Sequence, residues 1–300
     1  WRAMSGQTTA AVSQTQLFPA NPARLALAEG PARMLLEKRP AGWRVLEPFE
    51  WPANVWSVQR LIDELRFISP ESGFDVAEVT ANGASLKDYG LEPARWTVKV
   101  TGDAGAAVEV KVGVQPSTRR HFLLTEDGRR IVPLPDAMAA ALGASAESYR
   151  VDRIFEIADF EARAVSVRHR SKDGEVVTAL TSEARPRIGR RVQFPEWRFE
   201  TPYDALADAD ATARAVADLT NLRASKFVAL GDEVTGLTNP VLRLSLEGNS
   251  RRQVLLVGQP VPAQPTLLCA KLEENPSVFV IEARLLNEWF TCIMDLPAES

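Results

Sequence analysis

The stretch Trp43-Arg44-Val45-Leu46-Glu47-Pro48 returns later in the chain as Trp197-Arg198-Phe199-Glu200-Thr201-Pro202. In both copies a helical pattern follows, then a Gly-Leu turn with a proline, then two short strands that end in Val-Gly. The two tryptophans lie 154 residues apart (197 − 43), which is far longer than the period of a solenoid repeat. The sequence therefore predicts a tandem duplication of one whole domain.

On both sides of Trp43 the residue pattern is that of strands followed by one helix. Residues 23–28 and 33–38 alternate around Gly30-Pro31, which predicts a hairpin, and residues 42–46 predict a third strand. A helix capped by Asn54 is expected next. Its apolar residues recur with the spacing of one helix face: Val55, Val58, Leu61, Ile62 and Leu65.

Further strands and helices are expected in both copies. The predicted strand pairs are 96–100 with 108–112, 121–124 with 130–132, 164–168 with 176–180, 242–246 with 254–257, and 267–269 with 278–281. The predicted helices run through Met138 and Leu142, through Ala213, Val216, Leu219 and Leu222, and through Leu285, Leu286, Trp289 and Phe290. We expect an α+β fold of two tandem homologous units, each a mainly antiparallel sheet packed against one or two helices. The boundaries are a flexible tether at 1–19, a first repeat at 20–146 and a second repeat at 147–300.

The composition is that of a soluble globular protein. The 300 residues are 45% hydrophobic and 25% charged, with a formal net charge of −4. An acidic balance argues against nucleic-acid binding, which needs a basic footprint. No run of 18 apolar residues predicts a membrane span. Because the chain starts at Trp1 without an initiator Met, we expect a processed or trimmed product, with a possible membrane anchor upstream.

The residues that carry catalytic or metal chemistry are sparse. His121 and His169 lie in strand patterns, without an acidic or cysteine partner at ligand spacing. Asp208 and Asp210 fit a helix N-terminus better than a metal pair, because carboxylates there meet unpaired amides. Glu71, Asp75 and Glu78 are scattered, so they do not indicate a pair of catalytic carboxylates. The segment Gly102-Asp103-Ala104-Gly105 lies between strands rather than before a helix, so it lacks the helix N-terminus that would bind a phosphate. The sequence predicts no catalytic, cofactor-binding or metal-binding residues and no cofactor.

Cys269 and Cys292 are the two cysteines, and neither forms a C-x-x-C pair. They either pair with each other or remain two buried thiols, and we favour the second alternative. Two cysteines do not indicate a redox compartment.

Arginine doublets and tryptophans are the surface candidates. The doublets are Arg119-Arg120, Arg129-Arg130, Arg190-Arg191 and Arg251-Arg252, and we interpret them as edge protection of strands rather than as an anionic-partner surface. Trp43 and Trp197 hold equivalent places and are expected to anchor each core. Trp51 and Trp56 have no counterpart in the second copy, and either form an exposed aromatic contact for sugar or protein or pack at the start of the helix.

These motifs together resemble a known bacterial family. Three motifs carry the resemblance: Gly42-Trp43-Arg44-Val45-Leu46-Glu47-Pro48, then Asp88-Tyr89-Gly90-Leu91-Glu92-Pro93, then Val112-Gly113. With them the chain resembles the family catalogued as domain of unknown function 4340 over about residues 20–290. The second copy departs from the pattern with Thr235 before Gly236 and an additional Asn239 before Pro240. The resemblance implies one N-terminal membrane anchor, a body outside the cytoplasm, and an accessory role in ABC-type transport systems of the gliding-motility type. It implies no catalytic residue.

The leading hypothesis is therefore a non-enzymatic extracytoplasmic module, in the periplasm or cell envelope, that binds protein partners beside a membrane transport complex. It would be tethered to the inner membrane by a segment absent from this chain. The alternative is a ligand- or glycan-binding domain with its site in the cleft between the repeats. A hydrolase would require His121 or His169 to meet an acidic residue and a nucleophile in space.

Overall fold

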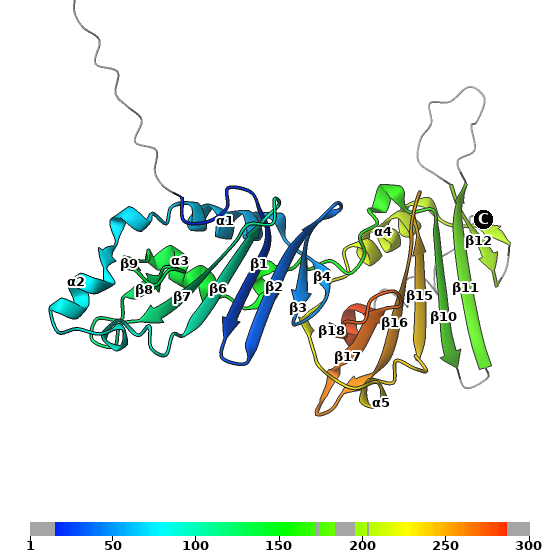
Figure 1. Ribbon diagram of the computed structural model, residues 1–300. Helices are drawn as coiled ribbons and strands as arrows, with labels where there is room; N and C mark the ends of the chain where they lie inside the picture. Colours follow the sequence, from blue (N-terminus) through cyan, green and yellow to red (C-terminus); the bar gives the residue numbers. More distant parts are fainter. Residues whose placement is uncertain (1–15, 172–173, 184–195, 203, 287–300) are drawn as a thin grey trace, which may run out of the picture. The chain divides into compact units, whose positions relative to one another are not determined.

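The computed structural model describes residues 16–171, 174–183, 196–202 and 204–286, and these form two compact units that divide between Val151 and Asp152 (Figure 1). Four features expected from the sequence lie wholly or largely outside the described residues. They are the tether at 1–19, the Arg190-Arg191 doublet, Cys292 and the end of the closing helix. Among the described residues, none of the helices has the length and apolar character needed to cross a bilayer.

The first unit is built on one antiparallel sheet of nine strands. The strands are β1 (Pro22–Glu29), β2 (Ala32–Arg39), β3 (Gly42–Glu47), β4 (Trp51–Pro52), β5 (Phe74–Asp75), β6 (Trp96–Gly102), β7 (Ala107–Val114), β8 (His121–Leu124) and β9 (Arg130–Pro133). Their order is β4-β3-β2-β1-β6-β7-β8-β9-β5. The expected hairpins around Gly30 and Gly128 are confirmed as the pairs β1–β2 and β8–β9.

The helices of the first unit are short and cover both faces of this sheet. They are α1 (Val55–Arg66), η1 (Pro70–Ser72), α2 (Val76–Ala81), η2 (Leu86–Tyr89), α3 (Asp136–Leu142) and η3 (Ala146–Tyr149). Four residues of the expected α1 face are buried: Val58, Leu61, Ile62 and Leu65. Val55 was expected on the same face but is 55% exposed, so that part of the prediction is wrong. Asn54 caps the helix, as expected, by accepting hydrogen bonds from the amides of Trp56 and Ser57. Phe122 and Leu124 alternate with Leu123 along β8, so they lie on the face of the sheet opposite to that of Leu123. On that face they pack with Val79, Leu91 and Ile131 under the α2–η2 segment.

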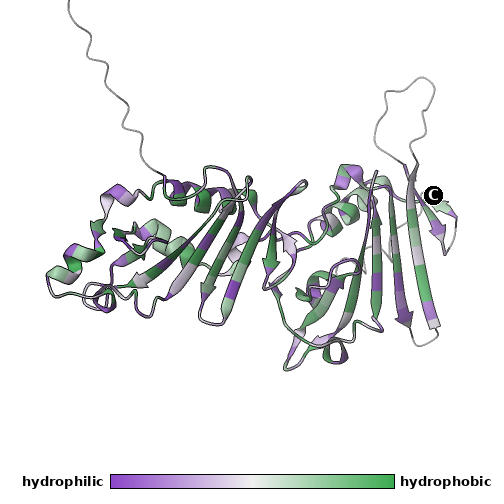
Figure 2. Cartoon of the chain, in the orientation of Figure 1, coloured by the Kyte–Doolittle hydropathy of each residue, from purple (hydrophilic) through white to green (hydrophobic). Residues whose placement is uncertain are grey.

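The second unit has the same strand order, element for element. Its strands are β10 (Ala164–Ser171), β11 (Gly174–Glu183), β12 (Glu196–Thr201), β13 (Ala205–Leu206), β14 (Lys226–Phe227), β15 (Leu242–Glu247), β16 (Arg252–Val261), β17 (Gln264–Leu272) and β18 (Phe279–Glu282). Their order is β13-β12-β11-β10-β15-β16-β17-β18-β14. The helices are η4 (Asp159–Glu161), α4 (Ala209–Thr220) and α5 (Asp232–Thr235). Figure 2 shows the apolar and polar residues as alternating bands along many of the strands.

The expectation of an α+β fold is wrong, because both units are dominated by sheet. Strand accounts for 43% of the structure and helix for 23%. The sheets extend further than the sequence pattern predicts because the two-residue strands β4, β5, β13 and β14 form their edges. Two residues are too few to show an alternating pattern, so these segments read as loops in the sequence. The helices, of 12 residues at most, cover sheet faces rather than form a layer of comparable size.

The repeated glycines mark a place where two backbone segments cross in contact. Gly90 follows η2 with φ 69°, and a Cβ placed on it would lie 2.1 Å from the carbonyl oxygen of Val114. A Cβ on Gly113 would lie 2.1 Å from the carbonyl oxygen of Gly90. In the second unit a Cβ on Gly258 would lie 2.0 Å from the carbonyl oxygen of Thr235. The Gly-Leu and Val-Gly motifs are therefore requirements of the fold and carry no chemistry of their own.

Candidate functional site

The two histidine candidates for catalysis lie in different units. His121 lies in β8 of the first unit, with its ring 5.8 Å from the Trp96 ring, and His169 lies in β10 of the second unit. Asp208 caps α4, since its carboxylate accepts a hydrogen bond of 2.7 Å from the Ala211 amide, and this confirms the capping interpretation. Within the described part of the chain, no three His, Cys, Asp or Glu side chains gather as metal ligands would.

The acidic candidates Glu71 and Glu78 lie in two short helices of the first unit. Glu71 lies in η1, where its amide donates to the Ser69 hydroxyl, and Glu78 lies in the first turn of α2. The segment Gly102-Asp103-Ala104-Gly105 is the turn between β6 and β7, as expected. Cys269 is buried in β17, and burial raises the pKa of its thiol. A buried thiol of raised pKa is a poor nucleophile.

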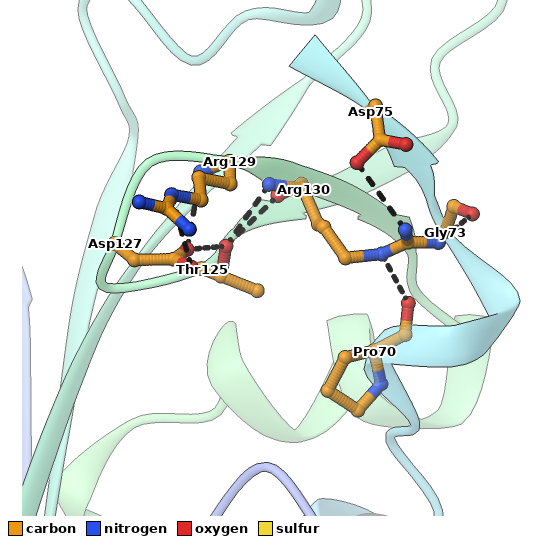
Figure 3. Close-up of polar contacts among 7 residues, drawn as sticks. All are labelled: Pro70, Gly73, Asp75, Thr125, Asp127, Arg129 and Arg130. Carbon is orange, nitrogen blue, oxygen red and sulfur yellow. Dashed lines mark hydrogen bonds and ion pairs between the residues drawn. The ribbon is translucent and has the colours of Figure 1, made fainter.

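Arg130 is a structural residue that fastens the 70–75 segment to the sheet edge (Figure 3). Its guanidinium donates from Nε to the Pro70 carbonyl at 2.8 Å and from Nη2 to the Gly73 carbonyl. Its Nη1 lies 3.3 Å from Oδ1 of Asp75. One side chain thus satisfies two carbonyls beside β5 and neutralises the remaining acidic candidate. The Arg129 side chain, its neighbour, is 83% exposed.

The tryptophans divide between core and surface. Trp197 is buried, as expected, whereas Trp43 at the equivalent place is only half-buried. Trp51 is 1% exposed and its Nε1 donates to the Val151 carbonyl at 3.0 Å. Trp51 therefore offers no face to a sugar or a partner. Trp56 is 80% exposed.

Trp56 is one of three exposed apolar side chains on α1 and at its end. Phe67, which ends the helix, is also 80% exposed, and Val55 is 55% exposed. Trp56 and Phe67 are 11 residues apart, which is three turns within about 20°, so both lie on one face about 16 Å apart along the axis. We refer to Val55, Trp56 and Phe67 as the α1 surface.

The second unit shows that the fold does not require these aromatics. Asn54 and Asp208 cap the two equivalent helices, and each helix has 12 residues. Counting from these caps, the positions of Trp56 and Phe67 are occupied in α4 by Asp210 and Asn221. Asp and Asn also suit the two ends of a helix better than large aromatics do. The α1 surface is thus particular to the first unit.

The sequence signal for this surface was incomplete. The lack of a counterpart in the second copy identifies Trp56 as a candidate, but the same criterion also selects the buried Trp51 and does not select Phe67. The spacing of 11 residues, read together with the polar residues at the equivalent positions of the second copy, is the signal that identifies Phe67.

A protein-family model matches part of the chain. The family model described as "Domain of unknown function (DUF4340)" matches residues 43–189, from Trp43 in β3 through β10 and β11 of the second unit. No curated protein matches the chain. The matched segment begins at Trp43 and ends shortly before Trp197, so it covers nearly one period of the repeated pattern. Residues 43–189 of this chain are therefore the part that matches the family of domain of unknown function 4340.

Proposed function

We propose that this chain is a non-enzymatic protein-binding module that acts outside the cytoplasm as an accessory of a membrane transport complex of the ABC type. The observation that carries the binding role is the pair Trp56 and Phe67, each 80% exposed on one face of α1. Large aromatic side chains left in water are costly, and tryptophan and other aromatics are the residues that dominate protein interfaces.

The α1 surface is large enough to contribute to a specific complex. A partner that covers the indole and the phenyl ring removes roughly 300 Å² of apolar area from water, worth on the order of 7 kcal/mol. Association costs are of similar size, so the two rings act as anchors within a wider contact rather than as a complete interface. Polar side chains lie between the two rings on the same helix, where Asp63 accepts hydrogen bonds from Gln59 and Arg66. Such polar groups can help to orient a partner.

The location and the transport role rest on the family. The motifs around Trp43, Gly90 and Gly113 resemble a family whose members are anchored outside the cytoplasm beside transporters, and the match over residues 43–189 supports that resemblance. The acidic net charge of −4 favours protein partners over nucleic acid.

The test is affinity capture from solubilised membranes of the source cells with the whole chain as bait. The variant W56D/F67N carries the residues that α4 has at the same positions, so both substitutions suit the helix ends. The control is Phe160→Asp, because Phe160 is 76% exposed in the second unit and the change is chemically similar.

We expect the unaltered chain and F160D to recover transporter components and W56D/F67N to recover at least about tenfold less, since each lost aromatic anchor costs more than 1 kcal/mol. Recovery of no transporter component by the unaltered chain contradicts the transport role. Equal recovery by W56D/F67N contradicts the assignment of the α1 surface.

A further inference from the structure

The second unit carries an arginine-lined depression on the face of its sheet that points away from the main core. A cavity of about 200 Å³ is lined by residues of four neighbouring strands, β10, β11, β15 and β16. The lining residues are Ser166, Arg168, Val177, Arg243, Ser245 and Arg252, which we call the arginine face. Residues 165, 167, 244 and 246 alternate with them along β10 and β15 and are buried in the core.

The strand register brings like groups directly opposite each other. Ser166 pairs with Ser245 and Arg168 pairs with Arg243 across β10 and β15. Like charges placed directly opposite on a sheet are destabilising. Each arginine of this pair has a carboxylate partner, Glu175 for Arg168 and Glu273 for Arg243, and these partners offset the repulsion.

The first unit shows that the fold works without these residues. In β10–β15 Val165 faces Leu246, and in β1–β6 Leu25 faces Val100, which aligns the two sheets. The positions of Arg168 and Arg243 are then held by Ala28 and Thr97. The other positions are likewise different: Ser166 corresponds to Ala26, Ser245 to Lys99, and Arg252 to Ala107.

Carboxylates hold the three guanidinium groups in place. Arg168 Nε lies 3.6 Å from Glu175, and Arg243 Nη2 lies 2.5 Å from Glu273. Arg252 Nε lies 3.2 Å from Glu247 and donates to the Ser245 hydroxyl at 2.8 Å. These contacts engage Nε of Arg168 and Arg252 and Nη2 of Arg243, and a guanidinium has five N–H donors. Each arginine is thus oriented and still has donors for an incoming acceptor.

We propose that the arginine face binds a small molecule through an oxyanion, either a phosphate or a carboxylate group. Three guanidinium groups offer donors only, and charge-assisted hydrogen bonds to an oxyanion are the strongest contacts that they make. Val177 provides an apolar wall beside the anionic group. The volume equals about seven water molecules, which suits a small ligand rather than a polypeptide segment.

The test is titration of the whole chain with inorganic phosphate and, separately, with acetate, at constant ionic strength. Binding is followed by NMR at the arginine Nε–H groups. We expect saturable shifts at Arg168, Arg243 and Arg252 with at least one of the two anions, and the stronger one identifies the type of oxyanion. The variant R168A/R243T, which carries the residues of the first unit, should bind roughly tenfold weaker for each arginine lost.

The control is R24A/R95A, which removes two exposed, carboxylate-paired arginines from the first unit and changes the charge equally. It should bind like the unaltered chain. Absence of saturable shifts with both anions, or equal weakening in the control, overturns the proposal. Should R168A/R243T not fold, Arg252→Ala takes its place, because alanine stands at the equivalent position in the first sheet.

Discussion

Gly113→Ala should destabilise the first unit strongly, although it adds only one methyl group. The new Cβ would lie 2.1 Å from the carbonyl oxygen of Gly90, and real Cβ contacts essentially never fall below 3.0 Å. The obstacle is backbone, so η2 and β7 must separate by about 1 Å where they cross, which disturbs the packing beneath them. Overpacking of this kind costs about 3 kcal/mol. For a unit of about 150 residues that loss lowers the melting temperature by about 6–12 °C.

The assay is thermal unfolding of the whole chain, followed by circular dichroism. The matched control is Gly143→Ala at the end of α3, where the nearest atom to a new Cβ is 3.6 Å away and φ is −79°. That substitution should be neutral or stabilise by up to about 1 kcal/mol. Gly258→Ala should behave like Gly113→Ala, because its Cβ would lie 2.0 Å from the Thr235 carbonyl oxygen. Melting temperatures for G113A and G143A that agree within error would refute the crossing as the reason for the motif.

Three further predictions follow from single side chains. Trp51→Phe should lose about 1 kcal/mol in urea unfolding, because the partly buried Val151 carbonyl loses its indole donor and keeps the longer bond from Arg150 at 3.3 Å. An unchanged midpoint would contradict that role. Arg130→Met should speed amide hydrogen exchange in residues 70–75, because the Pro70 and Gly73 carbonyls lose their donor. The control Arg129→Met should leave the exchange unchanged. Equal protection in both variants would argue against the fastening role of Arg130. Burial raises the pKa of Tyr149 to about 12, above its ordinary value of 10.0. Because the folded state holds the neutral phenol, this stabilisation is complete below pH 10 and is lost as the pH rises from 10 to about 12. The alkaline fall in stability should be smaller in Y149F, and identical pH profiles would contradict it.

The local structure could be predicted from the sequence where a pattern is long or a turn is chemically distinct. The hairpin around Gly30, the Asn54 cap and the buried face of α1 are of this kind. The short edge strands could not be predicted, because Trp51–Pro52 and Phe74–Asp75 become strands only by pairing with β3 and β9. That long-range pairing turned an expected α+β fold into two sheet-dominated units.

The candidate sites were harder to predict, because side chains gather across strands. Each arginine doublet consists of two residues that are neighbours in sequence. Because successive residues of a strand point to opposite faces, such a pair does not indicate a shared site on one face of a sheet. Arg168, Arg243 and Arg252 come from three strands and meet only through the register of the second sheet. Arg130, by contrast, faces backbone carbonyls, which leave no pattern in the sequence.

The most direct test of the proposed function is photo-crosslinking in intact membranes. A photoreactive residue is placed at position 56 of the whole chain and, in a separate variant, at the equivalent position 210 of α4. The account predicts a covalent adduct with a subunit of a membrane transport complex from position 56 and none from position 210. Adducts of equal yield from both positions, or no adduct with a transport subunit from position 56, would contradict it.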